Sequence, residues 1–165
     1  MVTLTVVANP RWLEPDEQKA WRGFLQSYAQ LTAFLGRELT KETGLSMQDY
    51  AVLVELSESP EGRMRAFELG RKLVWEKSRL SHHVARMTNR GLVARRECPS
   101  DHRGSFIEIT ESGREAIEEA APKHAEAVRD YFVDVLSPQE LRALATIAEK
   151  VESKLERRCD ACSDG

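Results

Sequence analysis

Apolar residues in the first third of the chain recur at intervals of three and four, the spacing of one helix face. Over residues 21–39 this spacing predicts a long helix that begins after Pro15 and ends near Gly44, because glycine readily adopts the left-handed conformation that closes a helix. Ser46, followed three residues later by Asp49, has the pattern of a capping box, so we expect a second helix to begin there. The Ser-Pro-Glu-Gly run of residues 59–62 should end it.

Two shorter helices and a β-hairpin are predicted next. Apolar residues indicate a short third helix (Phe67, Leu69, Leu73, Val74) and the buried face of a fourth (Leu80, Val84, Met87, Gly91). Residues 92–98 and 105–110 are β-prone, and the polar, basic residues 99–104 between them should form the tip of a hairpin.

The last third of the chain predicts two more helices. One begins at Thr110 and continues toward Leu136, with a bend at Pro122. The next begins at Ser137, because a capping serine is followed by Pro138 and, three residues after the cap, by Glu140. Residues 159–165 are expected to be a frayed tail.

Together these elements predict a mainly α fold with one small hairpin. Three short helices followed by a hairpin are typical of a winged helix-turn-helix, which we place at residues 44–110. Residues 11–43 and 111–158 expose apolar helix faces that one small winged domain cannot cover, so we expect them to form a helical dimerisation region of a homodimer. A helical bundle within one chain is the alternative.

The distribution of charge changes what the composition implies about partners. The 165 residues carry a net charge of −3, which by itself disfavours nucleic acid. Residues 63–103, however, hold eleven Lys or Arg against four Asp or Glu, a net of +7, so the other residues carry −10. We therefore expect double-stranded DNA to meet this basic segment and to be repelled from the acidic faces.

The exposed side of the fourth helix is the predicted base-reading surface. With Leu80 at the centre of the buried face, a step of about 100° per residue puts five hydrogen-bonding side chains on the opposite side (Ser78, Arg79, His82, Arg86, Asn89). At the hairpin, Arg103 is expected to reach the minor groove with Asp101 holding it or a neighbouring arginine. Arg95 and Arg96 point to opposite sides of their strand, so only one should face phosphate. The alternative is that these charges form a solvated surface.

A pocket for a small, possibly phenolic or aromatic, effector is expected beside the DNA-reading unit. Apolar and phenolic side chains gather there on the first two helices (Trp21, Phe24, Tyr28, Met47, Tyr50). The alternative is that these side chains are ordinary members of the hydrophobic core.

Five segments follow one another along the chain: residues 68–73 (ELGRKL), 78–87 (SRLSHHVARM), 91–93 (GLV), 101–103 (DHR) and 107–114 (IEITESGR). On these segments the sequence resembles the MarR family of bacterial transcriptional regulators, and the resemblance runs in order from about residue 15 to 157. Two positions depart from the family pattern, since Cys98 replaces an acidic residue before the wing proline and Arg65 replaces a Ser or Thr cap.

The resemblance implies an obligate homodimer in which the first, fifth and sixth helices intertwine. It also implies that the two winged domains read a pseudo-palindromic operator, and that a small ligand bound between the dimer helices and the winged domain relieves regulation. We expect a repressor that is released from DNA by this ligand.

The cysteines support an alternative function. Cys98 at the wing base, or the Cys159/Cys162 pair, could make the protein a redox- or metal-responsive DNA-binding sensor. A helical interaction protein without a DNA role is a further alternative. No nucleophile and base set, paired carboxylates or phosphate-binding glycine loop is present, so we expect no catalytic residues, no enzyme, no resident metal and no cofactor. Without a signal peptide or an apolar run of about 20 residues, a cytoplasmic protein with no membrane partner is expected.

Overall fold

The computed structural model describes residues 11–98 and 101–163, and for residues 97–98, 101–104 and 157–163 it describes the backbone alone. Residues 11–34 and the described residues from Leu35 onward form two units, which are described separately. The first unit is the N-terminal part of helix α1 (Pro15–Thr43), whose bounds agree with the prediction. The second unit contains the end of α1, where Leu35 and Leu39 are buried.

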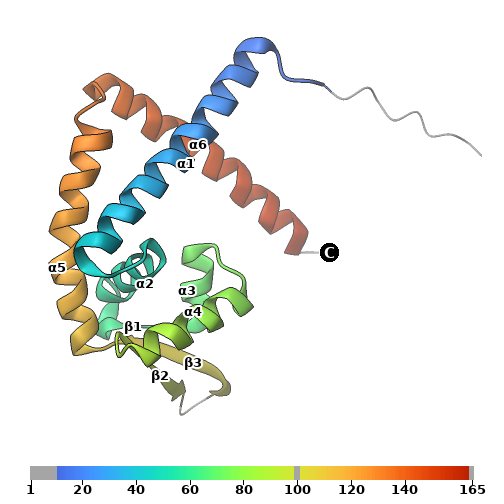
Figure 1. Cartoon of the computed structure of the whole chain (residues 1–165). Helices are drawn as coiled ribbons and strands as arrows, with labels where there is room; N and C mark the ends of the chain where they lie inside the picture. The colour runs from blue at the N-terminus through green and yellow to red at the C-terminus, as the bar shows by residue number, and fades with distance from the viewer. Residues whose placement is uncertain (1–10, 99–100, 164–165) are drawn as a thin grey trace, which may run out of the picture. The chain divides into compact units, whose positions relative to one another are not determined.

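Three helices of the second unit form the helix-turn-helix region (Figure 1). α2 (Met47–Ser57) begins with the predicted capping box, in which Ser46 Oγ accepts from Asp49 N and Asp49 Oδ2 accepts from Ser46 N. α3 (Ala66–Leu73) and α4 (Lys77–Asn89) follow, joined by a short turn. Glu68 supports the start of α3 by accepting from the backbone N–H of Arg65.

Two apolar residues assigned to the third helix are exposed rather than buried. Phe67 is 66% exposed, because it lies about 200° around the helix from the buried Leu69. Val74 is 88% exposed and caps α3 with φ 53° and ψ 43°, a left-handed conformation that turns its side chain outward. A β-branched residue is strained in this left-handed backbone conformation, so the contacts of the surrounding fold must hold the turn into α4 in place.

A three-stranded antiparallel sheet in the order β1-β3-β2 completes the winged domain. β2 (Val93–Cys98) and β3 (Asp101–Ile109) form the predicted hairpin, but β3 begins at Asp101, so residues 101–104 belong to a strand and not to the tip. Backbone pairing of Cys98 with Asp101 overrides the polar, turn-like composition of this segment. The third strand, β1 (Arg63–Arg65), was not predicted, because three residues carry too little pattern; it pairs Met64 with Ile107.

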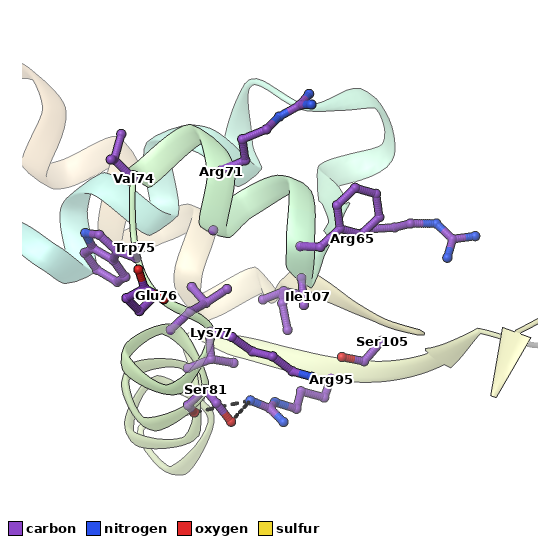
Figure 2. Close-up of a pocket in the computed structure, with 15 residues that line it drawn as sticks. Arg65, Arg71, Val74, Trp75, Glu76, Lys77, Ser81, Arg95, Ser105 and Ile107 are labelled. Carbon is purple, nitrogen blue, oxygen red and sulfur yellow. Dashed lines mark hydrogen bonds between the residues drawn. The ribbon is translucent and has the colours of Figure 1, made fainter. Parts of the chain in front are cut away.

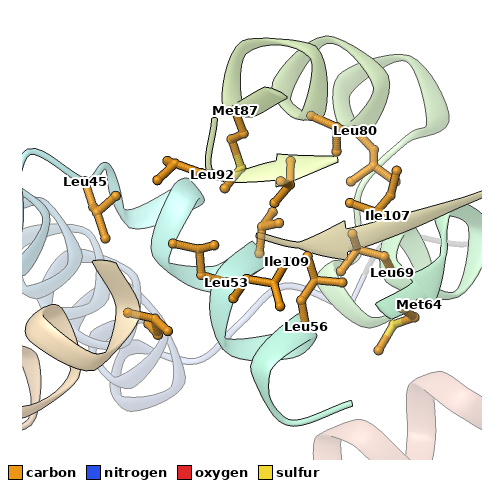
Figure 3. Packing of buried hydrophobic residues seen from close by; sticks show 14 of the residues in the cluster. Leu45, Leu53, Leu56, Met64, Leu69, Leu80, Met87, Leu92, Ile107 and Ile109 are labelled. Carbon is orange, nitrogen blue, oxygen red and sulfur yellow. The ribbon is translucent and has the colours of Figure 1, made fainter. Parts of the chain in front are cut away.

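One hydrophobic core holds these elements together (Figure 3). Side chains from α2, α3, α4 and the strands meet in it, and Leu53, Leu56, Leu69, Met87 and Ile107 are fully buried. Leu80, Val84 and Met87 are all buried, which confirms this part of the predicted inner face of α4. Gly91, predicted on the same face, is exposed because α4 ends at Asn89. The outer face of α4 is thereby fixed as the surface that meets solvent or a ligand.

Two helices follow the sheet. α5 (Glu111–Val128) begins at Thr110, whose Oγ1 accepts from Gly113 N, and it continues through Pro122 into a π-helical segment (Arg129–Val133). α6 (Pro138–Ser163) begins at the predicted cap, where Ser137 Oγ accepts from Glu140 N. It extends beyond the predicted start of a frayed tail at residue 159, because no glycine or proline interrupts residues 139–163. None of the helices in the described part of the chain is long and apolar enough to cross a membrane.

Candidate nucleic-acid interface

The outer face of α4 presents the five side chains that the helical period places there. Ser78, Arg79, His82, Arg86 and Asn89 are all exposed, whereas the opposite face of the helix is buried in the core. Four of these side chains donate hydrogen bonds through hydroxyl, guanidinium or amide groups, and an imidazole can also donate. These are the groups that contact base edges and phosphates of DNA. Their contact with DNA stays a prediction.

Arg79 is held against an aromatic ring on the turn that precedes α4. Its guanidinium carbon lies 4.6 Å from the centre of the Trp75 ring, a cation–π contact. The Trp75 ring in turn meets the His83 ring edge to face, with centroids 5.2 Å apart. Arg79 therefore has a side-chain orientation fixed by residues that lie closer to the core.

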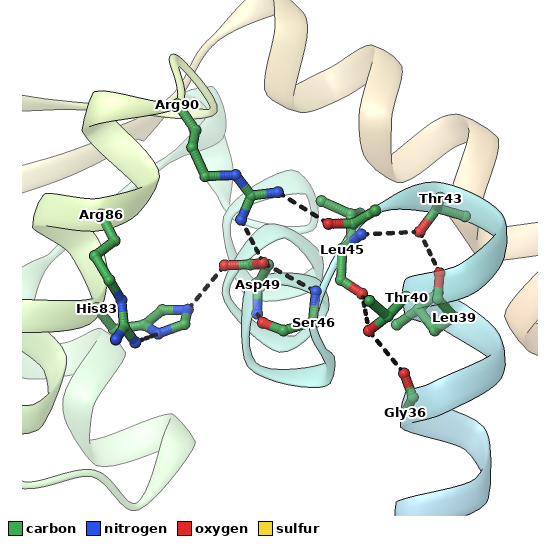
Figure 4. A network of polar contacts seen from close by, with 11 residues as sticks. Gly36, Leu39, Thr40, Thr43, Leu45, Ser46, Asp49, His83, Arg86 and Arg90 are labelled. Atoms are coloured by element: carbon green, nitrogen blue, oxygen red, sulfur yellow. Dashed lines mark hydrogen bonds and ion pairs between the residues drawn. The ribbon is translucent and has the colours of Figure 1, made fainter.

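Arg86 belongs to a polar network that links α4 to the start of α2 (Figure 4). Its Nη2 donates to His83 Nδ1 over 2.9 Å, and His83 Nε2 lies 3.0 Å from Asp49 Oδ1. Arg90 Nη1 donates to Asp49 Oδ2 over 2.7 Å, and Arg90 Nη2 donates to the Gly44 carbonyl. Asp49 and His83 are buried, so this carboxylate and imidazole anchor cationic side chains that reach the surface.

The surroundings shift the pKa values of both buried groups. Burial alone would raise the pKa of Asp49, but hydrogen bonds from Ser46 and Arg90 lower it below its ordinary value. Burial lowers the pKa of His83, and the cationic Arg86 and Arg79 act in the same direction, while Asp49 opposes them. Asp49 is therefore ionised and His83 is neutral at pH 7.

Sequence reasoning missed this network, although a signal for it exists. Asp49 was interpreted only as part of a helix cap, and His83 was not singled out. His83 lies one residue before the buried Val84 and three after Leu80, so the helical period turns it inward. A histidine at an inward position requires a polar partner, and such a partner could have been sought.

The two arginines of β2 lie on opposite faces of the sheet, as alternation predicts. Arg95 is on the side of α4, where its Nη2 donates to Ser81 O and Ser81 Oγ over 3.2 and 3.0 Å. Arg96 is on the other side and donates from Nε to Glu108 Oε2 over 2.9 Å. The cation next to the reading helix is therefore Arg95. The side chains of Asp101 and Arg103 lie outside the described residues.

A cavity of about 600 Å³ lies between α3, α4 and the sheet, at a place that the sequence did not indicate (Figure 2). The apolar Leu80, Val84 and Ile107 line it together with the cationic Lys77 and Arg95. The α4 residues that line it, among them Lys77 and Ser81, lie on a different face of the helix from the predicted DNA-contacting residues.

Comparisons with known proteins agree with this geometry. The MarR family model matches residues 43–104. Transcriptional regulator HosA of Escherichia coli O111:H- is 30% identical over 133 residues, which cover 81% of this chain and 94% of HosA. The crystal structure of AbsC, a MarR family transcriptional regulator from Streptomyces coelicolor, superposes with a TM-score of 0.84 at 41% identity, covering 89% of this chain and 99% of AbsC. The chain belongs to the MarR family.

A second solved MarR regulator bears on the interface. Sco3205 from Streptomyces coelicolor, whose crystal structure is in complex with DNA, is 40% identical with a TM-score of 0.85, covering 88% of this chain and 92% of Sco3205. This chain is therefore, like Sco3205, a DNA-binding transcriptional regulator of the MarR family. Its relatives are transcriptional regulators rather than enzymes.

The residues predicted to line an effector pocket lie in both units of this MarR protein. In the first unit, Trp21, Phe24 and Tyr28 form a run of stacked rings along α1 with centroid separations of 6.2 and 6.4 Å. In the second unit, Met47 and Tyr50 lie on α2, and the Tyr50 ring is 4.6 Å from the His124 ring. Each group is assembled within its own unit, and a shared pocket stays a prediction.

The cysteine alternative falls on side chains outside the described residues. The backbones of Cys98, Cys159 and Cys162 lie in β2 and α6, and nothing further is described for them. Among the side chains that the structure does describe, no group of three or more His, Cys, Asp or Glu residues is arranged to hold a metal ion.

Proposed function

We propose that this MarR regulator is a homodimeric repressor that reads a pseudo-palindromic operator with the outer face of α4. The observation that supports it best is the pair of exposed arginines on that face, Arg79 and Arg86, each oriented by an inner residue. A guanidinium with a fixed direction can bond a guanine edge through two parallel donors. Ser78, His82 and Asn89 complete the major-groove surface.

The wing supplies the second set of contacts in this proposal. Arg95 lies next to α4 and is assigned to a phosphate, while Arg96 is engaged with Glu108 on the other face. Arg103, with Asp101, is assigned to the minor groove beyond the major-groove contacts.

The dimer is proposed from apolar side chains that a single chain leaves uncovered. Trp21, Phe24 and Tyr28 on α1 are each more than half exposed, and so are Ile147, Val151 and Leu155 on α6. Exposed apolar stripes of this length mark an interaction surface. A two-fold dimer would bury them and place two α4 helices about one DNA turn, roughly 34–36 Å, apart.

Selection of bound sequences from a random DNA pool tests this function. We expect an enriched inverted repeat whose half-sites are separated by about one helical turn. Affinity for the selected duplex should fall steeply with salt, because each neutralised phosphate releases counterions. Recovery of no common sequence, with binding equal for all duplexes, would argue against an operator-reading regulator.

A small aromatic effector completes the proposal. Titrating the operator complex with a panel of phenols and aromatic carboxylates should identify compounds that release the DNA, by favouring a dimer with wrongly spaced reading helices. A variant with serine at positions 98, 159 and 162 should respond to the same compounds. Release of the operator by an oxidant or a metal ion that the wild type shows and that variant lacks would favour the redox or metal sensor instead.

A further inference from the structure

His83 is a buried polar residue at the centre of the DNA-reading helix. It is 6% exposed, and three side chains surround its ring: Asp49 from α2, Trp75 from the turn before α4, and Arg86 one turn further along α4. None of the proposed DNA contacts uses His83 directly. It is nevertheless the group that connects the core to Arg86 on the surface.

The contacts of His83 determine where its proton resides. A guanidinium can only donate, so the hydrogen bond from Arg86 Nη2 requires that Nδ1 is an unprotonated acceptor. The proton of the neutral ring is then on Nε2, which faces Asp49 Oδ1 at 3.0 Å. Asp49 is itself fixed by Ser46 and Arg90. The imidazole is held in one tautomer with its acceptor directed at Arg86.

We propose that His83 is a positioning residue for DNA recognition, whose neutral imidazole directs the Arg86 guanidinium toward its base and whose protonation releases that guanidinium. The inference rests on the proposed function of α4. An arginine reads a base with two donors only in one orientation, so loss of its inner partner weakens discrimination more than it weakens general affinity for DNA.

Protonation has a defined effect because the charged groups around His83 are known. Asp49 faces it from α2, and Arg86 and Arg79 face it from α4, with Arg90 acting through Asp49. A proton on Nδ1 removes the acceptor for Arg86 and places a second positive charge beside it. Burial keeps the pKa of His83 below its ordinary value of 6.5, so the ring becomes charged only in acid.

The test measures selectivity at one base pair. The pair read by Arg86 is the position of the selected duplex at which the Arg86→Ala variant no longer discriminates. Selectivity is the ratio of Kd values for a duplex changed at that pair and for the unchanged duplex, and we expect about tenfold or more for the wild type at pH 7. His83→Leu should reduce this ratio to the level of Arg86→Ala. His83→Asn should keep it within about threefold of the wild type, because the Asn Oδ1 occupies the place of Nδ1.

A double-mutant cycle separates positioning from general structure. In the Arg86→Ala background, His83→Leu should change the ratio less than about twofold, because its effect passes through Arg86. An equal loss of affinity for all duplexes in both backgrounds would show a merely structural role and overturn the proposal. Circular dichroism and sedimentation confirm that each variant is folded.

The wild-type protein provides a test that does not depend on any variant at position 83. Its selectivity ratio should fall as the pH is lowered below 6.5. The fall, taken relative to each protein's own ratio at pH 7, should persist in His82→Asn, which removes the histidine on the outer face of α4. A ratio that stays constant down to the lowest pH at which the protein remains folded would overturn the inference while leaving the proposed function intact. A wild type without sequence preference at any pH would overturn both.

Discussion

Asp49 and Arg90 are 41 residues apart in sequence, yet Arg90 Nη1 donates to Asp49 Oδ2 over 2.7 Å and so joins the start of α2 to the end of α4. The carboxylate is almost fully buried, while the guanidinium is partly exposed and also donates to the Gly44 carbonyl. The same carboxylate caps α2 and faces His83. One acidic side chain therefore fixes the position of the recognition helix relative to the core.

Replacing Asp49 with alanine should strongly destabilise the fold. The change removes the capping box and leaves His83 and Arg90 without a carboxylate, so we expect a loss of about 3 kcal/mol in the free energy of unfolding. Urea denaturation of both proteins at the same protomer concentration measures it. Arg90→Ala is the matched control and should cost only about 1 kcal/mol, because its guanidinium is nearly half exposed. Equal losses in the two variants would contradict the central role of Asp49.

Arg86 and Arg95 should produce different kinds of binding defect. Arg86→Ala should cost about 1–3 kcal/mol on the selected operator and relax specificity at one base pair, as expected for a base contact. Arg95→Ala should weaken binding to all duplexes about equally and reduce the slope of log affinity against log salt by about one. Fluorescence anisotropy over a salt series measures both quantities. Loss of base discrimination in Arg95→Ala, with an unchanged salt slope, would reverse the assignment.

Two glycines should respond oppositely to alanine. Gly113 lies in the first turn of α5 directly beneath the Leu92 carbonyl, and a methyl group there would overlap that oxygen. We expect Gly113→Ala to cost about 2–3 kcal/mol, since the backbone of Leu92 or of α5 must move. Gly36 lies in α1, where a methyl group would only touch Met47 Cβ at 3.8 Å. Gly36→Ala should therefore stabilise the protein by about 0.5–1 kcal/mol. Denaturation midpoints that shift in the same direction for both would contradict this packing.

Local sequence signals predicted the helices well because they act within one turn. The capping boxes at Ser46 and Ser137 and the Leu80, Val84 and Met87 face of α4 depend on neighbours three or four residues away. Strand β1 could not be predicted in this way, because Met64 forms a strand through pairing with Ile107, 43 residues later. The role of Asp49 likewise depends on α4.

The candidate site was predicted only in its outer layer. Helical period identified the exposed side of α4, including Arg79 and Arg86. It did not identify Trp75 and His83 as the groups that orient these arginines. These contacts depend on the angle between α4 and the turn before it, which the helical period does not give. The cavity beside Ser81 was missed for the same reason, because it arises where a sheet and two helices meet.

Stability should decrease on acidification below about pH 6.5. Burial lowers the pKa of His83 and of His124 in the folded protein, so between the folded and unfolded pKa values the unfolded chain binds more protons. The free energy of unfolding therefore rises with pH. The stabilisation that comes from keeping the two histidines neutral is complete above the histidine pKa of the unfolded chain, about 6.5. Urea denaturation at several pH values from 7.5 to 5 measures this slope. His83→Leu should flatten it in part, and a further His124→Leu change should remove most of the remainder. A steeper slope in His83→Leu would contradict the direction assigned to this pKa.

The apolar face of α6 should be required for dimerisation and, through it, for operator binding. Ile147, Val151 and Leu155 are four residues apart and lie along one side of the helix, each more than half exposed. Val151→Glu would place a charge in the middle of the proposed interface, where its desolvation is not compensated, so we expect the dimer Kd to rise at least tenfold. Sedimentation velocity over a concentration series measures this, and operator affinity should fall in parallel because two linked half-site contacts become one. Glu149→Lys changes a charge on the opposite side of α6 and should leave the association unchanged. A Val151→Glu protein that remains dimeric at the wild-type concentration would show that α6 does not hold the dimer together.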